Sequence, residues 1–286
     1  MLESLTGTRA AMRTPLDDIA ENGIAMLPGL LSAERVAAIN SAIDAILEEE
    51  GQPDGLNMFQ AAFRAPEILE LIREEPALDL MVNHLGYNLQ LASSVLSVRR
   101  PAPDPENGST FAGRNLPKAG STTTRLNWHR DGPSPRFPWI DTYSAKVAFV
   151  LSDLSQPDHG NTKVVPGSHL QRDFAPASGE PDEPIPGEMQ VLARPGDAYA
   201  FTQNIWHAAP TNASRVERRV IFIGYSSLWA RPLDYDKAPP HLLENADPIL
   251  RQLLGQVGPT TLHYFMPESM PLMKYWRGPE PVHSYA

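Results

Sequence analysis

The first ninety residues carry the hydrophobic spacing of amphipathic helices. Between residues 32 and 50, apolar side chains recur every three or four positions, which places them on one face of a helix: Val36, Ile39, Ile43 and Ile46. Helices are also expected at 14–23, 67–75 and 77–85, and a short strand at 24–27. Thr14 before Pro15 is a typical helix start, and Gly23 a typical end.

The pattern changes at residue 88, where β-branched residues become frequent and Pro/Gly turns come at short intervals. The strands predicted from this pattern are 88–100, 124–128, 143–151, 163–165, 189–193, 198–201 and 219–225. Residues 101–122 are expected to form a long loop, and helix returns at 241–254. Many short strands with such turns indicate a sandwich or barrel, the jelly roll included.

No composition break divides the chain into separate folding units. We therefore predict one domain over 1–286, with a mainly helical flank at 1–90, a β core at 88–230 and an extension at 231–286. The fold class expected is mainly β, with the amino-terminal helices packed on the outside of the β core.

Composition narrows the possible chemistry. The 286 residues include no Cys, which excludes disulfides, thiolate metal sites and a cysteine nucleophile, so any metal must be held by nitrogen and oxygen. The net charge of −10 disfavours nucleic acid as a partner, and it favours a neutral or cationic substrate over a large anionic thioester. There is no apolar run of about 18 residues and no apolar leader, so we expect a cytoplasmic protein without a membrane span.

The segment RLNWHRDGPSP contains His129 and Asp131, two positions apart. On a strand such residues point to the same face, which supplies an imidazole and a carboxylate to one point. A second histidine would complete the 2-His-1-carboxylate set of non-haem Fe(II) enzymes. The alternative is a polar strand end, in which Asp131-Gly132-Pro133 only forms a turn.

A second histidine, His207, follows a strand-like stretch, and RRVIFIGY begins eleven residues later. An inward arginine on that strand suits a carboxylate ligand, because a guanidinium offers two parallel donors. Both faces of the strand are apolar, so alternation does not decide between Arg218 and Arg219. Between the two histidine blocks, Pro166-Gly167 in KVVPGSH predicts a tight turn.

These blocks together resemble the phytanoyl-CoA dioxygenase family of Fe(II)/2-oxoglutarate-dependent oxygenases. The likeness rests on His129-x-Asp131, the PGSH block at 166–169, and His207 followed by Arg218, and it extends over most of 15–230. The resemblance implies a double-stranded β-helix, a cupin-like jelly roll. It also implies Fe(II), 2-oxoglutarate and O₂ as cofactor and cosubstrates, and oxidation of a C–H bond in a small molecule.

Carried over by residue, the resemblance makes His129, Asp131 and His207 the catalytic iron ligands. It assigns Arg218 to the distal carboxylate of 2-oxoglutarate, and Asn127 and Thr162 to further contacts with that cosubstrate. Related halogenases lack the carboxylate, so the presence of Asp131 predicts oxygenation instead of halogenation. Secondary-metabolite biosynthesis is the expected setting, with a lipid or acyl-CoA-type substrate as the alternative and a homodimer as a possible assembly.

Other residues near the motifs receive weaker assignments. Phe137 and Trp139 are candidates for an apolar substrate wall, and Arg125 shares a face with His129. His169 is expected to serve the PGSH turn, while Trp128 and Trp206 should face away from the neighbouring histidines and pack. Two other classes of function are considered: a jelly-roll binding protein without redox activity, and a zinc hydrolase in which Arg218 would have no role.

Overall fold

The computed structural model describes residues 13–53, 55–101, 128–131, 141–174, 185–210, 212–258 and 270–279. In these residues the strands form two antiparallel sheets, a six-stranded sheet in the order β1-β7-β4-β9-β3-β2 and a three-stranded sheet in the order β6-β5-β8. The strands are β1 (Ile24–Leu27), β2 (Gly55–Phe59), β3 (Leu89–Arg99), β4 (Ser144–Val150), β5 (Lys163–Val164), β6 (Met189–Gln190), β7 (Ala198–Thr202), β8 (His207–Ala208) and β9 (Arg218–Ser227).

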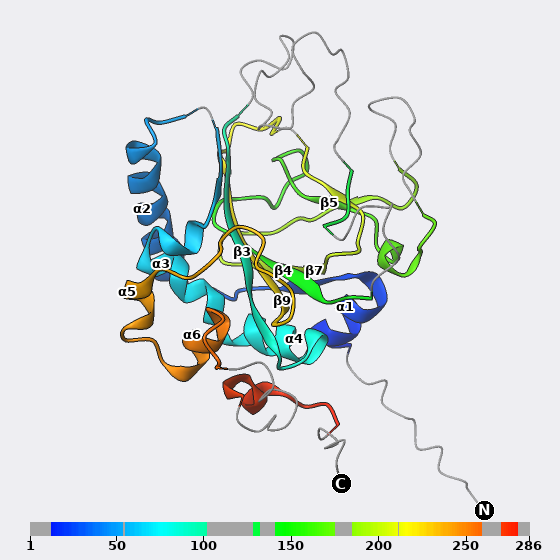
Figure 1. Ribbon diagram of the computed structural model, residues 1–286. Helices are drawn as coiled ribbons and strands as arrows, with labels where there is room; N and C mark the ends of the chain where they lie inside the picture. Colours follow the sequence, from blue (N-terminus) through cyan, green and yellow to red (C-terminus); the bar gives the residue numbers. More distant parts are fainter. Residues whose placement is uncertain are drawn as a thin grey trace, which may run out of the picture.

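Helices cover one face of the large sheet. Figure 1 shows α2 and α3 on one side of β3 and the small sheet, marked by β5, on the other. The helical elements are α1 (Pro15–Asn22), α2 (Ala33–Glu49), η1 (Ala61–Phe63), α3 (Pro66–Leu69), η2 (Glu70–Arg73), α4 (Glu75–Leu85), η4 (Ser168–Leu170), α5 (Pro240–Leu243), α6 (Pro248–Leu253) and η6 (Pro271–Tyr275).

The central strands of the large sheet are buried on both faces. In β4, Val147 and Phe149 belong to the core beneath the helices, whereas Ala148 and Val150 belong to a second core between the two sheets. The same division in β9 explains why its two faces are both apolar. Two facing antiparallel sheets with helices on the outside form a jelly roll, which confirms the predicted fold class.

Local signals in the sequence correctly placed both ends of α1 and the start of α2. Thr14 and Asp17 form a reciprocal capping box on α1, and Gly23 ends that helix in the left-handed conformation. The Ser32 side chain accepts a hydrogen bond from the Arg35 N–H and caps α2. These side chains satisfy backbone groups that a helix end leaves without partners.

Several predicted boundaries were wrong. The helix expected at 241–254 is divided into α5 and α6, because Asp247 precedes Pro248 and caps the second helix in extended geometry. The helix expected at 67–75 is α3 followed by η2, and α4 begins at Glu75. The strand expected at 189–193 ends at Gln190, and β2, at the edge of the large sheet, was not predicted. The loop at 101–122 and the strand at 124–128 fall almost entirely outside the described residues.

Gly196 is required by the close approach of two loops. It has φ +94°, and a Cβ added there would lie 2.6 Å from the backbone carbonyl oxygen of Leu31. Gly29 also has a positive φ, of +63°, but a Cβ there would meet nothing within 4 Å. Substitution of Gly29 therefore tests backbone strain alone, whereas substitution of Gly196 adds steric overlap with Leu31.

We expect Gly29→Ala to lower the free energy of unfolding by about 1 kcal/mol, the cost of a left-handed non-glycine residue. We expect Gly196→Ala to cost about 3 kcal/mol or more, because the overlapping carbonyl belongs to the backbone and cannot rotate away. Urea unfolding of both variants measures the difference. Equal losses would mean that the contact with Leu31 contributes nothing.

Candidate metal centre

His129 and His207 are brought together by a short antiparallel bridge. The His129 N–H donates to the His207 carbonyl and the His207 N–H to the His129 carbonyl, each at 3.0 Å. The Asp131 N–H donates to the Gln203 carbonyl at 2.9 Å, which extends the pairing beyond β8. This register places the two imidazole rings 4.2 Å apart between their centroids. Asp131 lies on the same side as His129, as the two-residue spacing predicts.

The three side chains form a compact set of nitrogen and oxygen donors. His129 Nε2 lies 3.8 Å from Asp131 Oδ1, and His207 Nε2 lies 3.7 Å from Asp131 Oδ2. Two donors that each lie about 2.1 Å from one ion can be at most about 4.2 Å apart, so both separations fit a shared ion. Of the His, Asp and Glu residues described, these three are the group that could hold a metal ion.

Neighbouring groups set the orientation of His207 and the protonation states of His207 and Asp131. The Nδ1 atom of His207 lies 3.1 Å from the Ile205 carbonyl oxygen, which leaves Nε2 for the metal. Burial lowers the pKa of His207 to about 4, so its imidazole is neutral at pH 7. Burial raises the pKa of Asp131, but Lys146, His207 and His129 oppose this effect and the net shift is downward. A neutral imidazole and an ionised carboxylate are the forms that bind metal.

Arg130 and Trp206 support the ligands from outside. Arg130 Nη2 donates to the carbonyls of Ser168 at 2.9 Å and Gln171 at 2.6 Å, and its guanidinium carbon lies 5.1 Å from the Trp206 ring. Trp206 Nε1 in turn donates to the Phe174 carbonyl at 2.7 Å. Each residue is a sequence neighbour of a ligand histidine. Together they hold the segment after PGSH against both ligand segments, a role that the sequence did not reveal.

We expect Arg130→Met to weaken metal binding about tenfold, because partners outside the ligand set typically contribute 10- to 100-fold to affinity. Titration with Co(II), followed by its visible spectrum, measures both affinity and ligand geometry. Arg64→Met is the control, since Arg64 pairs with Glu49 and Glu50 instead of the metal segment. An Arg130→Met variant with native Co(II) affinity and spectrum would contradict this role.

Arg218 is fully buried on the face of β9 that points between the sheets. Its Nη1 donates to Ser97 Oγ at 3.0 Å, whereas Nε and Nη2 are buried without a hydrogen-bond partner. Burial lowers the pKa of this guanidinium. The Thr162 and Tyr199 hydroxyls are 2.7 Å apart, and the charge of Arg218 opposes the rise that burial causes in the pKa of Tyr199. A buried guanidinium that interacts with the Tyr199 hydroxyl and has no carboxylate partner among the described residues is suited to a carboxylate.

A second arginine, Arg99, was not identified from the sequence. It is the direct partner of Arg218 in the β3–β9 register, and its Nη1 donates to the carbonyls of Ala209 at 2.8 Å and Pro210 at 2.5 Å. Burial and the charge of Arg218 lower the pKa of Arg99 to about 9. This end of the inner face therefore concentrates positive charge.

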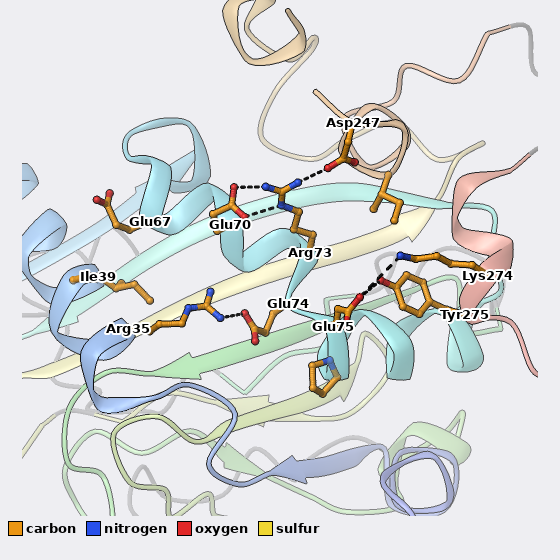
Figure 2. Close-up of a pocket in the computed structure, with 13 residues that line it drawn as sticks. Arg35, Ile39, Glu67, Glu70, Arg73, Glu74, Glu75, Asp247, Lys274 and Tyr275 are labelled. Atoms are coloured by element: carbon orange, nitrogen blue, oxygen red, sulfur yellow. Dashed lines mark hydrogen bonds and ion pairs between the residues drawn. The ribbon is translucent and has the colours of Figure 1, made fainter. Parts of the chain in front are cut away.

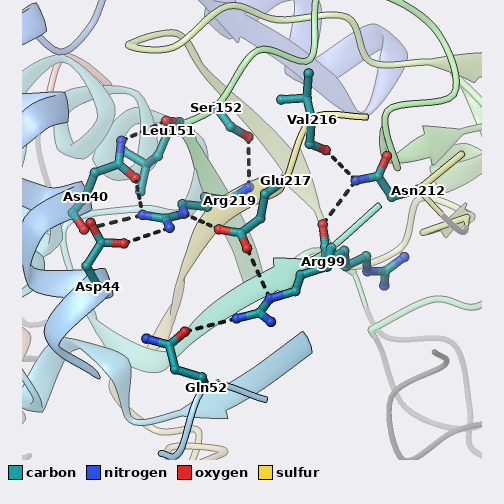
Figure 3. Close-up of polar contacts among 11 residues, drawn as sticks. Asn40, Asp44, Gln52, Arg99, Leu151, Ser152, Asn212, Val216, Glu217 and Arg219 are labelled. Carbon is teal, nitrogen blue, oxygen red and sulfur yellow. Dashed lines mark hydrogen bonds and ion pairs between the residues drawn. The ribbon is translucent and has the colours of Figure 1, made fainter. Parts of the chain in front are cut away.

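Arg219 points the opposite way, which decides between the two candidate arginines. Its side chain pairs with Asp44 at 2.7 Å and Glu217 at 2.6 Å, and its backbone N–H donates to Ser152 Oγ. Figure 3 shows Arg219 among these partners and Asn40 of α2, on the helix side of the sheet. Arg218 is the inward residue.

Of the remaining residues singled out from the sequence, the structure describes some and leaves others outside the described ranges. His169 lies outside the metal group, and its Nε2 is 3.1 Å from the Ala20 carbonyl oxygen, so its side chain contacts α1. The other residues with predicted roles lie outside the described residues: Asn127, Arg125, Phe137 and Trp139.

A cavity of about 790 Å³ lies apart from the triad, between α2, η2, α4, α6 and η6. Figure 2 shows that its charged side chains face one another. Arg35 pairs with Glu74, and Arg73 with Glu70 and Asp247. None of the triad residues lines it, and its charges are largely neutralised by these pairs.

Known proteins share both sequence and fold with this chain. The model of the phytanoyl-CoA dioxygenase (PhyH) family matches residues 19–220. "Dioxygenase andF" of Emericella variicolor is 31% identical over 122 residues, which are 42% of this chain and 40% of that protein. "Multifunctional dioxygenase prhA" of Penicillium brasilianum is 24% identical over 212 residues, 70% of this chain and 66% of that protein. The matched region thus spans about 40% of the length of the first of these relatives.

Two solved structures show the same fold. The 2-oxoglutarate-bound, nickel-bound HygX of Streptomyces hygroscopicus has a TM-score of 0.59 at 16% identity, covering 74% of this chain and 85% of its own. The carbocyclase SnoK from nogalamycin biosynthesis has a TM-score of 0.55 at 21% identity, covering 75% and 83%. In the part of the chain that is described, no helix combines the length and apolar character needed to cross a membrane. The family match covers most of the chain, including the His129, Asp131 and His207 motifs, and the chain belongs to the phytanoyl-CoA dioxygenase family.

Proposed function

We propose that this protein is a non-haem Fe(II)- and 2-oxoglutarate-dependent dioxygenase that oxidises a small molecule in natural-product biosynthesis. The observation that carries the proposal is the buried Arg218, with two unpartnered N–H-bearing atoms between the same two sheets as the triad. A buried guanidinium without an anion is costly. The distal carboxylate of 2-oxoglutarate supplies an anion whose two oxygens match the guanidinium fork.

In this proposal His129, Asp131 and His207 hold the Fe(II) ion, and the site fits it because its donors are nitrogen and oxygen with no thiolate. Arg218 binds 2-oxoglutarate, and the Thr162 hydroxyl, held beside it through Tyr199, contributes a further contact. Asn127 is proposed to contact the cosubstrate, and Arg125, Phe137 and Trp139 to contact the substrate.

When bound, Fe(II) and 2-oxoglutarate supply the O₂-dependent oxidation of a C–H bond, with release of succinate and CO₂. The chain supplies binding and orientation. The Ile205 carbonyl fixes the orientation of His207, and the charge of Lys146 helps to keep Asp131 ionised inside the fold. The apolar core between the sheets, with Phe201 and Val220, keeps water from the interior.

The relatives support the reaction class. The matched fungal proteins are named dioxygenases, and the structural neighbours include enzymes of nogalamycin biosynthesis described as 2-oxoglutarate-dependent. A zinc hydrolase with the same triad would leave the charge of Arg218 without an anion. The buried arginine therefore favours the oxygenase over the hydrolase.

The test is succinate formation from 2-oxoglutarate with Fe(II) and O₂, with Zn(II) in place of Fe(II) as the control. We expect slow succinate release with Fe(II) even without the true substrate, and none with Zn(II). Binding of 2-oxoglutarate is measured separately, by calorimetry on the Ni(II)-loaded protein. Failure to bind 2-oxoglutarate in the presence of metal would overturn the proposal.

A further inference from the structure

Lys146 lies on the inner face of the large sheet, next to the metal ligands. It shares a face of β4 with Ala148 and Val150, which belong to the core between the sheets. Its register partners are Phe201 in β7 and Gly224 in β9. Its Nζ atom is 2.7 Å from Asp131 Oδ2, and the lysine side chain is 21% exposed. An ammonium group therefore lies within ion-pair distance of a proposed metal ligand, on the face between the two sheets.

On the β9 side of Lys146, the neighbouring positions are small or polar. Gly224 leaves space there, since a Cβ added to it would lie 2.6 Å from Ser93 Oγ and 3.6 Å from Lys146 Cγ. Next along the same face, Ser226 pairs with Ser144, and the Ser226 side chain is 2% exposed with no hydrogen-bond partner for its Oγ atom. A buried hydroxyl without a hydrogen-bond partner and an ammonium group on the same sheet face can both donate to an oxyanion.

Once a metal is bound, the positive and negative charges near Lys146 no longer balance. Without metal, Lys146 balances Asp131. A divalent ion on the triad adds two positive charges, and the carboxylate that 2-oxoglutarate would place on the metal offsets one of them, which leaves one positive charge in excess. The charge of Lys146 also acts on Asp234, where it lowers the pKa that burial raises. The backbone N–H groups of Ser94 and Gln60 already donate to the Asp234 carboxylate. The distal carboxylate of 2-oxoglutarate is matched by Arg218, at the other end of β9.

We propose that Lys146, with the hydroxyls of Ser93, Ser144 and Ser226, forms a subsite for a carboxylate of the substrate, so that the substrate is an organic acid. This inference rests on the proposed function, because it uses a divalent ion on the triad and 2-oxoglutarate at Arg218. One ammonium group matches the single charge of a carboxylate better than the double charge of a phosphate. The whole-chain charge of −10 favoured a neutral or cationic substrate, whereas the inner face is locally positive.

The test uses four matched pairs of small probes, each a carboxylate and its primary amide: butanoate, hexanoate, benzoate and phenylacetate. The protein is loaded with Ni(II) and 2-oxoglutarate, so that the metal and Arg218 are already engaged. Dissociation constants are measured by ligand-observed NMR. We expect at least one acid to bind about tenfold more tightly than its amide, because the charged pair is the stronger interaction.

The preference for the acid should disappear in Lys146→Met, persist in Lys146→Arg, and persist in the control Lys237→Met, an exposed lysine. If no acid binds better than its amide in the native protein, the inference is wrong. It is also wrong if the preference survives in Lys146→Met, since the metal or Arg99 would then be the binding group. Loss of 2-oxoglutarate binding in the loading step would instead refute the proposed function.

Discussion

Replacing Arg218 with methionine is expected to weaken 2-oxoglutarate binding about 100- to 4000-fold without destabilising the metal-free protein. Truncating one partner of a buried charge pair typically costs 3–5 kcal/mol, and each 1.4 kcal/mol is a factor of ten. In the absence of the cosubstrate, Arg218 is a buried cation with two unpartnered nitrogen atoms. Methionine removes that desolvation cost, and against this it loses the hydrogen bond to Ser97 and the contacts with Tyr199 and the Phe222 ring. Calorimetry with Ni(II)-loaded protein and urea unfolding of the metal-free protein measure the two effects.

Arg219→Met is the matched control, because it changes the adjacent residue on the opposite face. Arg219 bridges Asp44 and Glu217 at the partly exposed contact with α2, so its loss should cost about 1 kcal/mol of stability. Its affinity for 2-oxoglutarate should be native. If the two variants behaved alike in both measurements, Arg218 would be only a structural residue.

Asp131→Asn is expected to reduce metal affinity by more than about 100-fold, and to abolish Fe(II)-dependent succinate release. The amide has nearly the same shape as the carboxylate but lacks the charge that binds a cation, so the loss should exceed that of a partner outside the ligand set. Co(II) titration measures affinity, and succinate release measures turnover. Asp131→Ala should give the same loss of metal binding.

The control is Asp44→Asn, an exposed carboxylate on α2. It should retain both metal affinity and succinate release. An Asp131→Asn protein that binds Co(II) like the native protein, or turns over at the native rate, would show that the metal lies elsewhere.

The triad and Arg218 were predicted from the family likeness, because the local signal at His129 and Asp131 is weak alone and His207 lies 78 positions from His129. The two-residue spacing of His129 and Asp131 fixes a common face on any extended segment. The choice of Arg218 over Arg219 came from the family likeness, since alternation failed on a strand buried on both sides. The structure explains that failure, because helices cover one face of β9 and the small sheet covers the other.

Other parts of the site had no local signal. Arg99 lies beside Arg218 because the β3–β9 register pairs these two residues, which are 119 positions apart in the sequence. In the sequence, Lys146 is an ordinary polar position in a strand. Only the structure shows that its ammonium group pairs with Asp131. Arg130 lies between two ligands, yet its contacts are with carbonyl groups of a turn about forty residues away.

The sequence by itself determined the helix caps, the turn-rich β texture, the exclusion of thiolate chemistry and the residues of the motifs, because each depends on neighbouring residues or on composition. Only the tertiary structure decided which side chains share the space between the sheets. That outcome depends on strand register, and a shift of one residue would move every side chain of a strand to the opposite face. The local positive charge around Lys146, Arg99 and Arg218 is therefore a property of the fold, within a chain whose net charge is −10.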